Sequence, residues 1–257
     1  MRIATWNVNS VRARLDRLVA FLGRHQPDVV CLQELKVPDE DFPLEAIEAA
    51  GYRAAVHGQR TYNGVAILSR VAAGDVRAGM EDGTLDEQAR LIAAVVGGIR
   101  VVNVYVPNGQ VVGSDKWEYK LAWLERLRAW FERECRPEEP LVLCGDFNVA
   151  LDDRDAAQPA DWADSVLCHE GARAALRRVT EWGLVDTVRL HHEGPGPYTW
   201  WDYRMLAFPK GNGLRIDHVF ATKGLAERCT GAWVDRDERK GKQPSDHAPV
   251  VVEFGEG

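Results

Sequence analysis

The stretch Leu141-Val-Leu-Cys-Gly-Asp-Phe-Asn148 decides how the rest of the chain is interpreted. Its first four residues are apolar and mostly branched, which is typical of a strand buried on both faces. Pro140 and Gly145 bound this run, so the predicted strand stops abruptly. Asp146 and Asn148 lie two positions apart, and in extended backbone their side chains would share one face. A carboxylate beside an amide at the end of a buried strand suits water activation or metal-bound phosphate chemistry.

The same motif has a second interpretation. Asp and Asn often close a strand by bonding to their own backbone in a turn, and Gly145-Asp-Phe-Asn148 fits that pattern as well. A motif this short does not distinguish a catalytic pair from a turn. The distinction depends on which other side chains could reach the same point.

The composition is that of a folded globular protein. The chain has 257 residues, of which 46% are hydrophobic and 28% charged, and we expect a single domain over residues 1–257 with a sizeable core. The formal net charge of -7 argues against a protein that coats nucleic acid through bulk charge. Carboxylates that hold a divalent metal would also make this charge more negative, so a nucleic-acid enzyme is not excluded.

The sequence predicts a reduced, cytoplasmic protein. Its N-terminal region carries several arginines and no long apolar run, so we expect no secretory signal. No stretch approaches the ~20 apolar residues that a membrane span needs, and we expect no membrane partner. The five cysteines show no Cys-x-x-Cys spacing, which argues against a disulfide framework.

Hydrophobic patterns predict a mixture of helices and strands. Apolar residues recur at helical spacing over residues 11–22, 43–50, 115–135 and 170–182. Strand-like runs lie at 1–8, 27–34, 52–56, 64–68, 90–96, 100–106, 141–148, 214–221, 231–234 and 249–254. Hairpin and crossover strands are mixed, which favours a single two-layer α/β sandwich over a Rossmann domain.

Polar residues stand at the ends of several predicted strands. They are Asn7 with Asn9, Glu34, Tyr105 with Asn108, Asp146 with Asn148, and Asp246 with His247. Asp217 lies inside the apolar run 214–220, where a buried carboxylate needs a strong partner. A histidine is the natural partner, and His247 is the candidate because His218 should point to the opposite face. So many clusters are hard to explain as independent turns, which favours the catalytic interpretation of Asp146.

With these clusters in place, the sequence resembles the exonuclease III family of Mg-dependent AP endonucleases. Nine motifs, in order and over nearly the whole chain, carry the resemblance: Thr5-Trp-Asn-Val-Asn9, Leu32-Gln-Glu34, Asn63-Gly-Val-Ala66, Tyr105-Val-Pro-Asn108, Gly145-Asp-Phe-Asn148, Trp182-Gly-Leu-Val-Asp-Thr187, Tyr198-Thr-Trp-Trp201, Leu214-Arg-Ile-Asp217 and Ser245-Asp-His247. The resemblance implies a four-layered, DNase I-like α/β sandwich with two mixed sheets face to face and the site at one end.

The resemblance also implies a cofactor and a set of catalytic roles. Glu34, helped by Asn9 and Asp246, resembles the Mg²⁺ ligand set, which Mn²⁺ could also occupy. Six residues match catalytic positions of the family: Asp146, Asn148, His247, Asp217, Asn7 and Tyr105. Asp146 would take a proton from the attacking water or orient it, and His247 would stabilise charge on the scissile phosphate.

The implied substrate is double-stranded DNA with abasic sites or blocked 3′ ends, acted on by a monomer. The implied activity is hydrolysis of the phosphodiester 5′ to an abasic site, together with 3′-5′ exonuclease and 3′-phosphatase or phosphodiesterase activity. Trp200, Leu214 and Ile216 match an apolar pocket for a flipped-out baseless sugar, although core packing is the alternative for Trp200. Three further residues match DNA-contacting loop positions: Tyr62, Asn63 and Asn108. Leu151 and Leu214 depart from the histidine and the tryptophan that relatives often carry there.

Two other functions fit parts of the pattern. Phosphoesterases that act on inositol phosphates or sphingolipids share the Glu, Asp-x-Asn and Asp-His elements, but give no reason for Trp200 near Leu214–Asp217. A non-catalytic nucleic-acid-binding module would predict a basic face and a broken set of polar clusters. The negative charge and the intact clusters of this chain argue against such a module.

Overall fold

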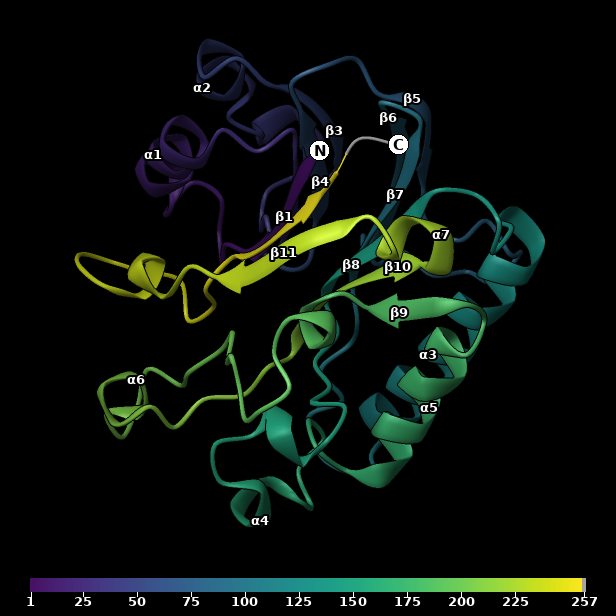
Figure 1. The fold of residues 1–257 in the computed structure, drawn as a ribbon, viewed down its shortest axis with the longest axis vertical. Helices are drawn as coiled ribbons and strands as arrows, with labels where there is room; N and C mark the ends of the chain where they lie inside the picture. Colours follow the sequence, from purple (N-terminus) through teal and green to yellow (C-terminus); the bar gives the residue numbers. More distant parts are fainter. Residues whose placement is uncertain (256–257) are drawn as a thin grey trace.

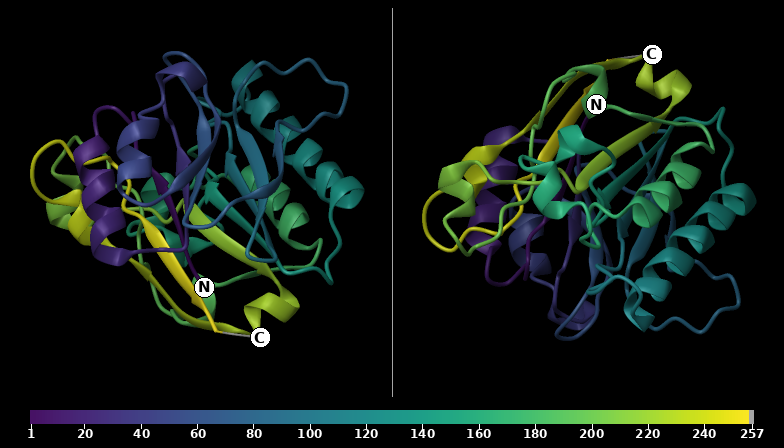
Figure 2. Two further views of the ribbon diagram at one scale, coloured as in Figure 1. Left: turned by 90° about the horizontal axis from the view of Figure 1, so that it is seen from above. Right: turned by 90° about the horizontal axis from the view of Figure 1, so that it is seen from below.

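Two β-sheets packed face to face form the centre of the protein, and helices cover their outer faces (Figures 1 and 2). The computed structural model describes residues 1–255. The first sheet has the strand order β11-β12-β1-β2-β4-β3. Its strands are β1 (Arg2–Asn7), β2 (Val29–Gln33), β3 (Arg53–His57), β4 (Val65–Ser69), β11 (Cys229–Val234) and β12 (Val250–Phe254).

The second sheet repeats the mixed arrangement with the order β5-β6-β7-β8-β10-β9. Its strands are β5 (Gly74–Ala78), β6 (Leu91–Val96), β7 (Ile99–Tyr105), β8 (Leu141–Asp146), β9 (Leu184–Asp186) and β10 (Asp217–Thr222). In each sheet one central pair is parallel, β1 with β2 and β7 with β8, and the other pairs are antiparallel.

The helices lie outside the two sheets (Figure 2). The first sheet is covered by α1 (Leu15–His25) and α2 (Leu44–Ala49), and the second by α3 (Asp115–Glu134) and α5 (Glu170–Thr180). Three helices of a single turn lie in connections: α4 (Pro159–Trp162), α6 (Ala207–Lys210) and α7 (Lys223–Ala226). None of the helices in the part of the chain that the structure describes is long and apolar enough to cross a membrane.

Alternation along the strands divides the core into three apolar layers. In β2, Val29 and Cys31 face the opposite sheet, while Val30 and Leu32 pack beneath the helices. Both faces of this strand are therefore buried, which explains its continuous apolar sequence. Helix α3 begins at the N-cap Ser114, whose side chain accepts a hydrogen bond from the Trp117 amide. Its apolar face, including Leu124, packs on the second sheet.

The four-layered sandwich implied by the family resemblance is confirmed, whereas the two-layer sandwich suggested by strand patterns alone is wrong. The patterns also missed β5 and β9. β5 is almost entirely exposed and lacks apolar alternation, and β9 has only three residues. The predicted strand 214–221 begins only at Asp217, because Leu214 pairs with Trp200 instead of with β8.

The topology brings the ends of six chain segments to one edge of the sandwich, called the site edge below. Parallel pairing aligns Asn7 with Gln33 and Tyr105 with Asp146, so β1, β2, β7 and β8 all finish there. β10 runs antiparallel and starts with Asp217 opposite Asp146. β12 is antiparallel to β1, so the segment that precedes it also arrives at the site edge. The residues that follow and precede these strands are therefore neighbours, although they are far apart in sequence.

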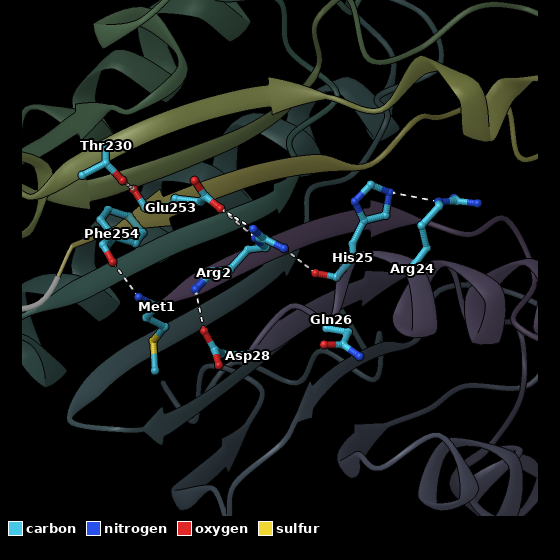
Figure 3. Close-up of a pocket in the computed structure, with 9 residues that line it drawn as sticks. All are labelled: Met1, Arg2, Arg24, His25, Gln26, Asp28, Thr230, Glu253 and Phe254. Atoms are coloured by element: carbon cyan, nitrogen blue, oxygen red, sulfur yellow. Dashed lines mark hydrogen bonds and ion pairs between the residues drawn. The ribbon is translucent and has the colours of Figure 1, made fainter.

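A hollow of about 480 Å³ lies where the chain begins and ends, and its polar groups bond mainly to one another (Figure 3). The Met1 ammonium donates a hydrogen bond to the Phe254 carbonyl. The Arg2 amide donates to Asp28, and the Arg2 guanidinium binds Glu253. These contacts join β1 to β12 and to the residue that precedes β2.

A buried group of charges holds the segments that lead into the site edge. The Asp155 carboxylate is fully buried and accepts hydrogen bonds from Arg215, at 2.6 Å, and from Arg189. Arg215 also binds Asp186 at 2.8 Å. Burial alone would raise the pKa of Asp155, but the charge of Arg215 and its hydrogen bonds outweigh it and hold the pKa at about 2.

We expect Asp155→Asn to lower the free energy of unfolding at pH 7 by about 3 kcal/mol, because two buried guanidinium groups lose a charged partner. The folded pKa lies below the unfolded value, so the carboxylate contributes fully above pH ~4 and progressively less toward pH ~2. Urea unfolding of both proteins over this pH range should show their difference shrinking as the pH falls. Asp153→Asn, at a carboxylate that is 76% exposed, is the control and should cost less than about 1 kcal/mol. Equal losses in the two variants would contradict a special role for the buried pair.

Candidate active site

Asn7 links the two sheets at the centre of the site edge. Its side-chain amide donates to Glu34 Oε1 and to Asp146 Oδ2, both at 2.9 Å. The hydroxyl of Tyr105 donates to the same Glu34 oxygen at 2.9 Å. Asn7 and Glu34 come from the first sheet, and Tyr105 and Asp146 from the second. These four side chains therefore form one hydrogen-bonded group across the sheet interface.

His247 and Asp217 form the second half of the site. The His247 ring donates from Nδ1 to Asp217 Oδ2 at 2.8 Å, and both side chains are buried. His247 Nε2 points toward Asp146, with 3.7 Å to Oδ2. The Thr199 hydroxyl donates to Asp217 Oδ2 at 2.6 Å and accepts from the Asp217 amide. Sequence reasoning gave Thr199 no role, and its only signal was its position beside Trp200 in an otherwise aromatic motif.

The buried charges shift the protonation of this group. Burial works against a charged His247, but the carboxylates of Asp217 and Asp146 outweigh it and raise the pKa to about 10. Burial, reinforced by the charge of Asp217, raises the pKa of Asp146 to about 7, although His247 acts in the opposite direction. At neutral pH the site therefore combines an imidazolium with a carboxylate that can accept a proton.

Asn148 is placed differently from the sequence prediction. Its φ of 50° puts the backbone in the left-handed region, so Asp146 and Asn148 do not alternate as in a strand. The backbone N–H of Asn148 donates to Asp146 Oδ1 at 2.9 Å. This hydrogen bond forms the Asp/Asn turn that the sequence offered as the alternative. The Asn148 side chain accepts from Asn108 at 2.9 Å and donates to the Val106 carbonyl at 3.0 Å. The motif is thus a backbone turn that also delivers Asp146 to the site edge.

Glu34, Asn9 and Asp246 carry side-chain oxygens that could bind a divalent cation. The Lys36 ammonium lies 2.9 Å from Glu34 Oε2 and donates to Asn9 Oδ1 at 2.6 Å. Asn9 in turn donates to Asp246 Oδ1 at 2.9 Å. Burial opposes ionisation of Glu34, but Lys36 and hydrogen bonds outweigh it and lower the pKa. A lysine head group thus bridges two of the predicted ligand oxygens, which fits a hard oxygen site for a divalent cation. Sequence reasoning missed Lys36.

A second set of potential ligand atoms lies beside the first. The ligand atoms of Asp146, Asp217 and His247 all lie within 4.8 Å of one another. Asp217 already accepts hydrogen bonds from His247 and Thr199, however, so its oxygens have less capacity left for a metal. Glu34 also accepts hydrogen bonds from Asn7 and Tyr105, but its second oxygen already faces the cationic Lys36. The pKa of His247 is about 10, so its protonated ring offers no lone pair to a metal, and Glu34 with Asn9 is the better-suited of the two candidate cation positions.

Trp200, predicted to line the sugar pocket, contacts Asp246, which is predicted to help hold the metal. Its indole Nε1 donates to Asp246 Oδ2 at 3.0 Å, and its ring meets Trp162 edge-on with a centroid distance of 5.8 Å. Trp200 is only partly buried, whereas Leu214 and Ile216 lie fully in the core behind it. In an extended segment Tyr198 would share a face with Trp200, two positions further on. That expectation is wrong, because Tyr198 packs with the separate apolar cluster around Trp201.

The predicted DNA-contacting loop residues lie together on the other side of Tyr105. Tyr62, Asn63 and Asn108 line a hollow of about 570 Å³ that also includes Arg90. Tyr62 is 68% exposed and available to a partner. Asn63 is buried, and its amide donates to Gln59 at 2.9 Å, so it shapes the loop from within.

The sequence of this chain matches a known protein family. The chain matches the Endonuclease/Exonuclease/phosphatase family over residues 4–247. It is 35% identical to exodeoxyribonuclease III of Haemophilus influenzae over 99% of this chain and 100% of the relative.

Solved structures agree with the sequence comparison. An AP endonuclease from Archaeoglobus fulgidus and the 3′-5′ exonuclease NExo from Neisseria meningitidis each superpose with a TM-score of 0.96, at 40% identity and over 99% of both chains. NExo from Neisseria, there described as a 3′ phosphatase, has also been solved bound to a product DNA hairpin. The chain therefore belongs to the endonuclease/exonuclease/phosphatase family, as the nine sequence motifs predict.

Proposed function

We propose that this DNA repair nuclease hydrolyses the phosphodiester 5′ to an abasic site in duplex DNA, with Mg²⁺ as its cofactor, and that it also trims blocked or normal 3′ ends. The observation that carries the proposal is the convergence of Asp146, the His247–Asp217 pair and the Glu34 oxygens at one edge of the sandwich. Relatives are named as exonuclease, AP endonuclease and 3′ phosphatase, and all of these reactions attack a phosphate ester.

Asp146 is suited to receive the proton of the attacking water. Its pKa of about 7 makes the carboxylate a competent base near neutral pH, and Asn7 and the Asn148 amide fix its oxygens. The imidazolium of His247 lies beside Asp146 and would stabilise the negative charge that develops on the phosphate. Asp217 and Thr199 hold the ring of His247 in this orientation.

Glu34, Asn9 and Asp246 would hold the metal. A bound Mg²⁺ would neutralise phosphate charge and polarise the ester, which an anionic substrate requires before a hydroxide can approach. Tyr105 keeps its proton, because burial, reinforced by Glu34 and Asp146, raises the pKa of the phenol well above its ordinary value. Its hydroxyl can therefore donate a hydrogen bond either to Glu34 or to a phosphate oxygen.

Two features favour DNA over a lipid or inositol phosphate. Trp200 lies beside Asp246, where it can meet a deoxyribose that lacks its base. The exposed Tyr62 and the hollow with Asn108 provide a surface next to the phosphate site that a nucleic-acid strand could follow. We further infer a single-domain monomer that works in the cytoplasm, since one chain supplies all of these groups and its five cysteines are free.

Asp146→Asn tests the base. We expect turnover of an abasic-analogue duplex to fall by at least about a hundredfold, the usual scale for a positioned base. Binding of the duplex should stay equal or become tighter, because one negative charge next to DNA is gone. Single-turnover rates and fluorescence anisotropy measure the two quantities, with Asp152→Asn as a surface control. A proportional loss of binding and turnover would make Asp146 a structural turn residue only.

The metal assignment is tested with wild type and Glu34→Gln on the same duplex. Wild type should cleave with Mg²⁺ and be inactive in a chelator, whereas no cleavage of abasic DNA under any condition would reject the proposed function. Glu34→Gln should need at least about tenfold more Mg²⁺ for half-maximal activity, because an amide replaces a charged ligand. The exposed Glu40→Gln is the matched control. Unchanged activity of Glu34→Gln at low Mg²⁺ would remove Glu34 from the ligand set.

Trp200→Ala tests selection for a missing base. Loss of an apolar pocket wall should slow incision at an abasic site by about 10- to 200-fold. The rate of 3′-phosphate removal should fall less, because a frayed DNA end reaches the site with fewer contacts to the pocket. The ratio of the two rates is the measured quantity, and thermal melting checks folding. Trp233→Ala, at another partly buried tryptophan on β11, should leave the ratio unchanged. An unchanged ratio in Trp200→Ala would return Trp200 to a packing role.

A further inference from the structure

Lys120 is a buried lysine behind the candidate site. It lies on the inner face of α3, fully buried between the aromatic and aliphatic side chains of that helix. Its ammonium donates three hydrogen bonds: to the carbonyls of Asn148 and Val166 at 2.7 Å and of Asn108 at 3.1 Å. Among the residues that the structure describes, its hydrogen-bond partners are all main-chain carbonyls.

A lysine at this position needs an explanation, because a leucine or methionine would fill the same space without a buried charge. Burial lowers the pKa of Lys120 to about 7, although the carboxylate of Asp146 acts in the opposite direction. An ammonium has three donor hydrogens, and here each meets one carbonyl. The three acceptors therefore account for the residue, because an apolar side chain of the same length would leave all three carbonyls without this donor.

The three carbonyls belong to three different loops. Asn108 follows β7, Asn148 follows β8, and Val166 precedes α5. Carbonyls in loops have no strand neighbour to satisfy them, so a single central donor can hold all three loops together. The loop at Gly109 wraps closely around the lysine stem: a Cβ at Gly109 would lie 3.0 Å from Lys120 Cδ.

Two of these loops carry the amide groups next to the catalytic carboxylate. The Asn108 side chain donates to Asn148 Oδ1, and the Asn148 backbone donates to Asp146 Oδ1. Asn148 adopts a left-handed backbone, which asparagine tolerates but which its local sequence does not enforce over an extended one. A shift of either loop would therefore move Asn148 relative to Asp146.

We propose that Lys120 is a positioning residue, which fixes Asn108 and Asn148 against Asp146 by tying their loops to α3. The proposal rests on the proposed function in one respect only, since it requires that Asp146 act at a phosphate ester. It does not depend on which ester is the preferred substrate.

Lys120→Met is the first test, because methionine keeps the length and removes all three donors. At a temperature well below melting, we expect kcat to fall by about 10- to 100-fold. The rise in KM should be smaller, since only the Asn108 loop among the three also lines the proposed DNA surface. Lys120→Arg, which keeps the charge and the donors, should recover part of the lost kcat. Leu127→Ala, a core truncation on the same helix, is the control: it should lower the melting temperature and leave kcat unchanged. Equal kcat in Lys120→Met and wild type, or equal losses in Lys120→Met and Leu127→Ala, would overturn the proposal.

A double-mutant cycle separates positioning from general stabilisation. If Lys120 acts by positioning groups against Asp146, its replacement should cost little further kcat in an Asp146→Asn background, whereas independent effects would multiply. If Lys120→Met does not fold, Lys120→Gln, which retains two donors, takes its place in the cycle. Multiplying losses overturn the proposal in either case.

Assays on two substrates distinguish the proposed function from the proposed role of Lys120. Each variant is assayed on the abasic duplex and on a duplex with a 3′-phosphate. A wild type that hydrolyses only the second substrate would reject abasic-site incision, while the Lys120 effect could still be measured on the substrate it does hydrolyse. A wild-type level of kcat for Lys120→Met on that substrate would reject the role of Lys120 alone.

Discussion

The hydrogen bond between His247 and Asp217 is the interaction on which the candidate site depends. Asp217 begins β10 in the second sheet, and His247 lies just before β12 of the first, so the bond crosses the interface between the sheets. Both groups are buried, where each would be costly without the other. Neither sheet can slide without breaking the pair and leaving an unpaired charge in the interior. The pair therefore fixes the distance across which Asn7 and Asp146 meet.

A neutral network behind the site adds a second connection between the sheets. The Gln33 amide donates to Asn103 Oδ1 at 2.7 Å and to the Thr5 hydroxyl at 2.9 Å, in the middle of the apolar interface. Asn103 in turn donates to the carbonyls of Leu32 and Ala66. These polar contacts are directional, unlike the packing around them, and so specify one register of the sheets. Gln33 directly precedes Glu34, and this register sets where the Glu34 carboxylate arrives.

The same burial that makes these groups costly makes them chemically useful. Burial, reinforced by the charge of Asp217, raises the pKa of Asp146, and the carboxylates of Asp217 and Asp146 raise the pKa of His247 against the effect of burial. A proton acceptor and a cation then coexist at neutral pH within a few ångströms. Two further sets of buried charges, Lys120 and the Asp155–Arg215 group, hold the loops that lead into the candidate site. Buried charged groups therefore serve both the stability of the fold and the proposed chemistry of the site.

The sequence by itself determined which residues could meet and which family they belong to. Polar residues after buried strands had to gather wherever those strands end, so Asn7, Glu34 and Asp146 were predictable as neighbours from pattern and motif order. The His247–Asp217 pairing followed from the cost of burying a lone carboxylate. The number of layers did not follow from strand patterns, because a continuous apolar run shows that a strand is covered on both faces but not whether a helix or a second sheet covers each face. Only the family resemblance supplied it.

Tertiary structure alone decided the contacts that join segments distant in sequence. Lys36, Thr199 and Lys120 carry no pattern that distinguishes them from ordinary surface or helix residues, and their roles appear only when their partners are folded around them. The left-handed turn at Asn148 also could not be derived, since local sequence permits both an extended and a turned backbone there. Sequence fixes local preference and burial, whereas long-range hydrogen bonds select one geometry among those that local preference allows.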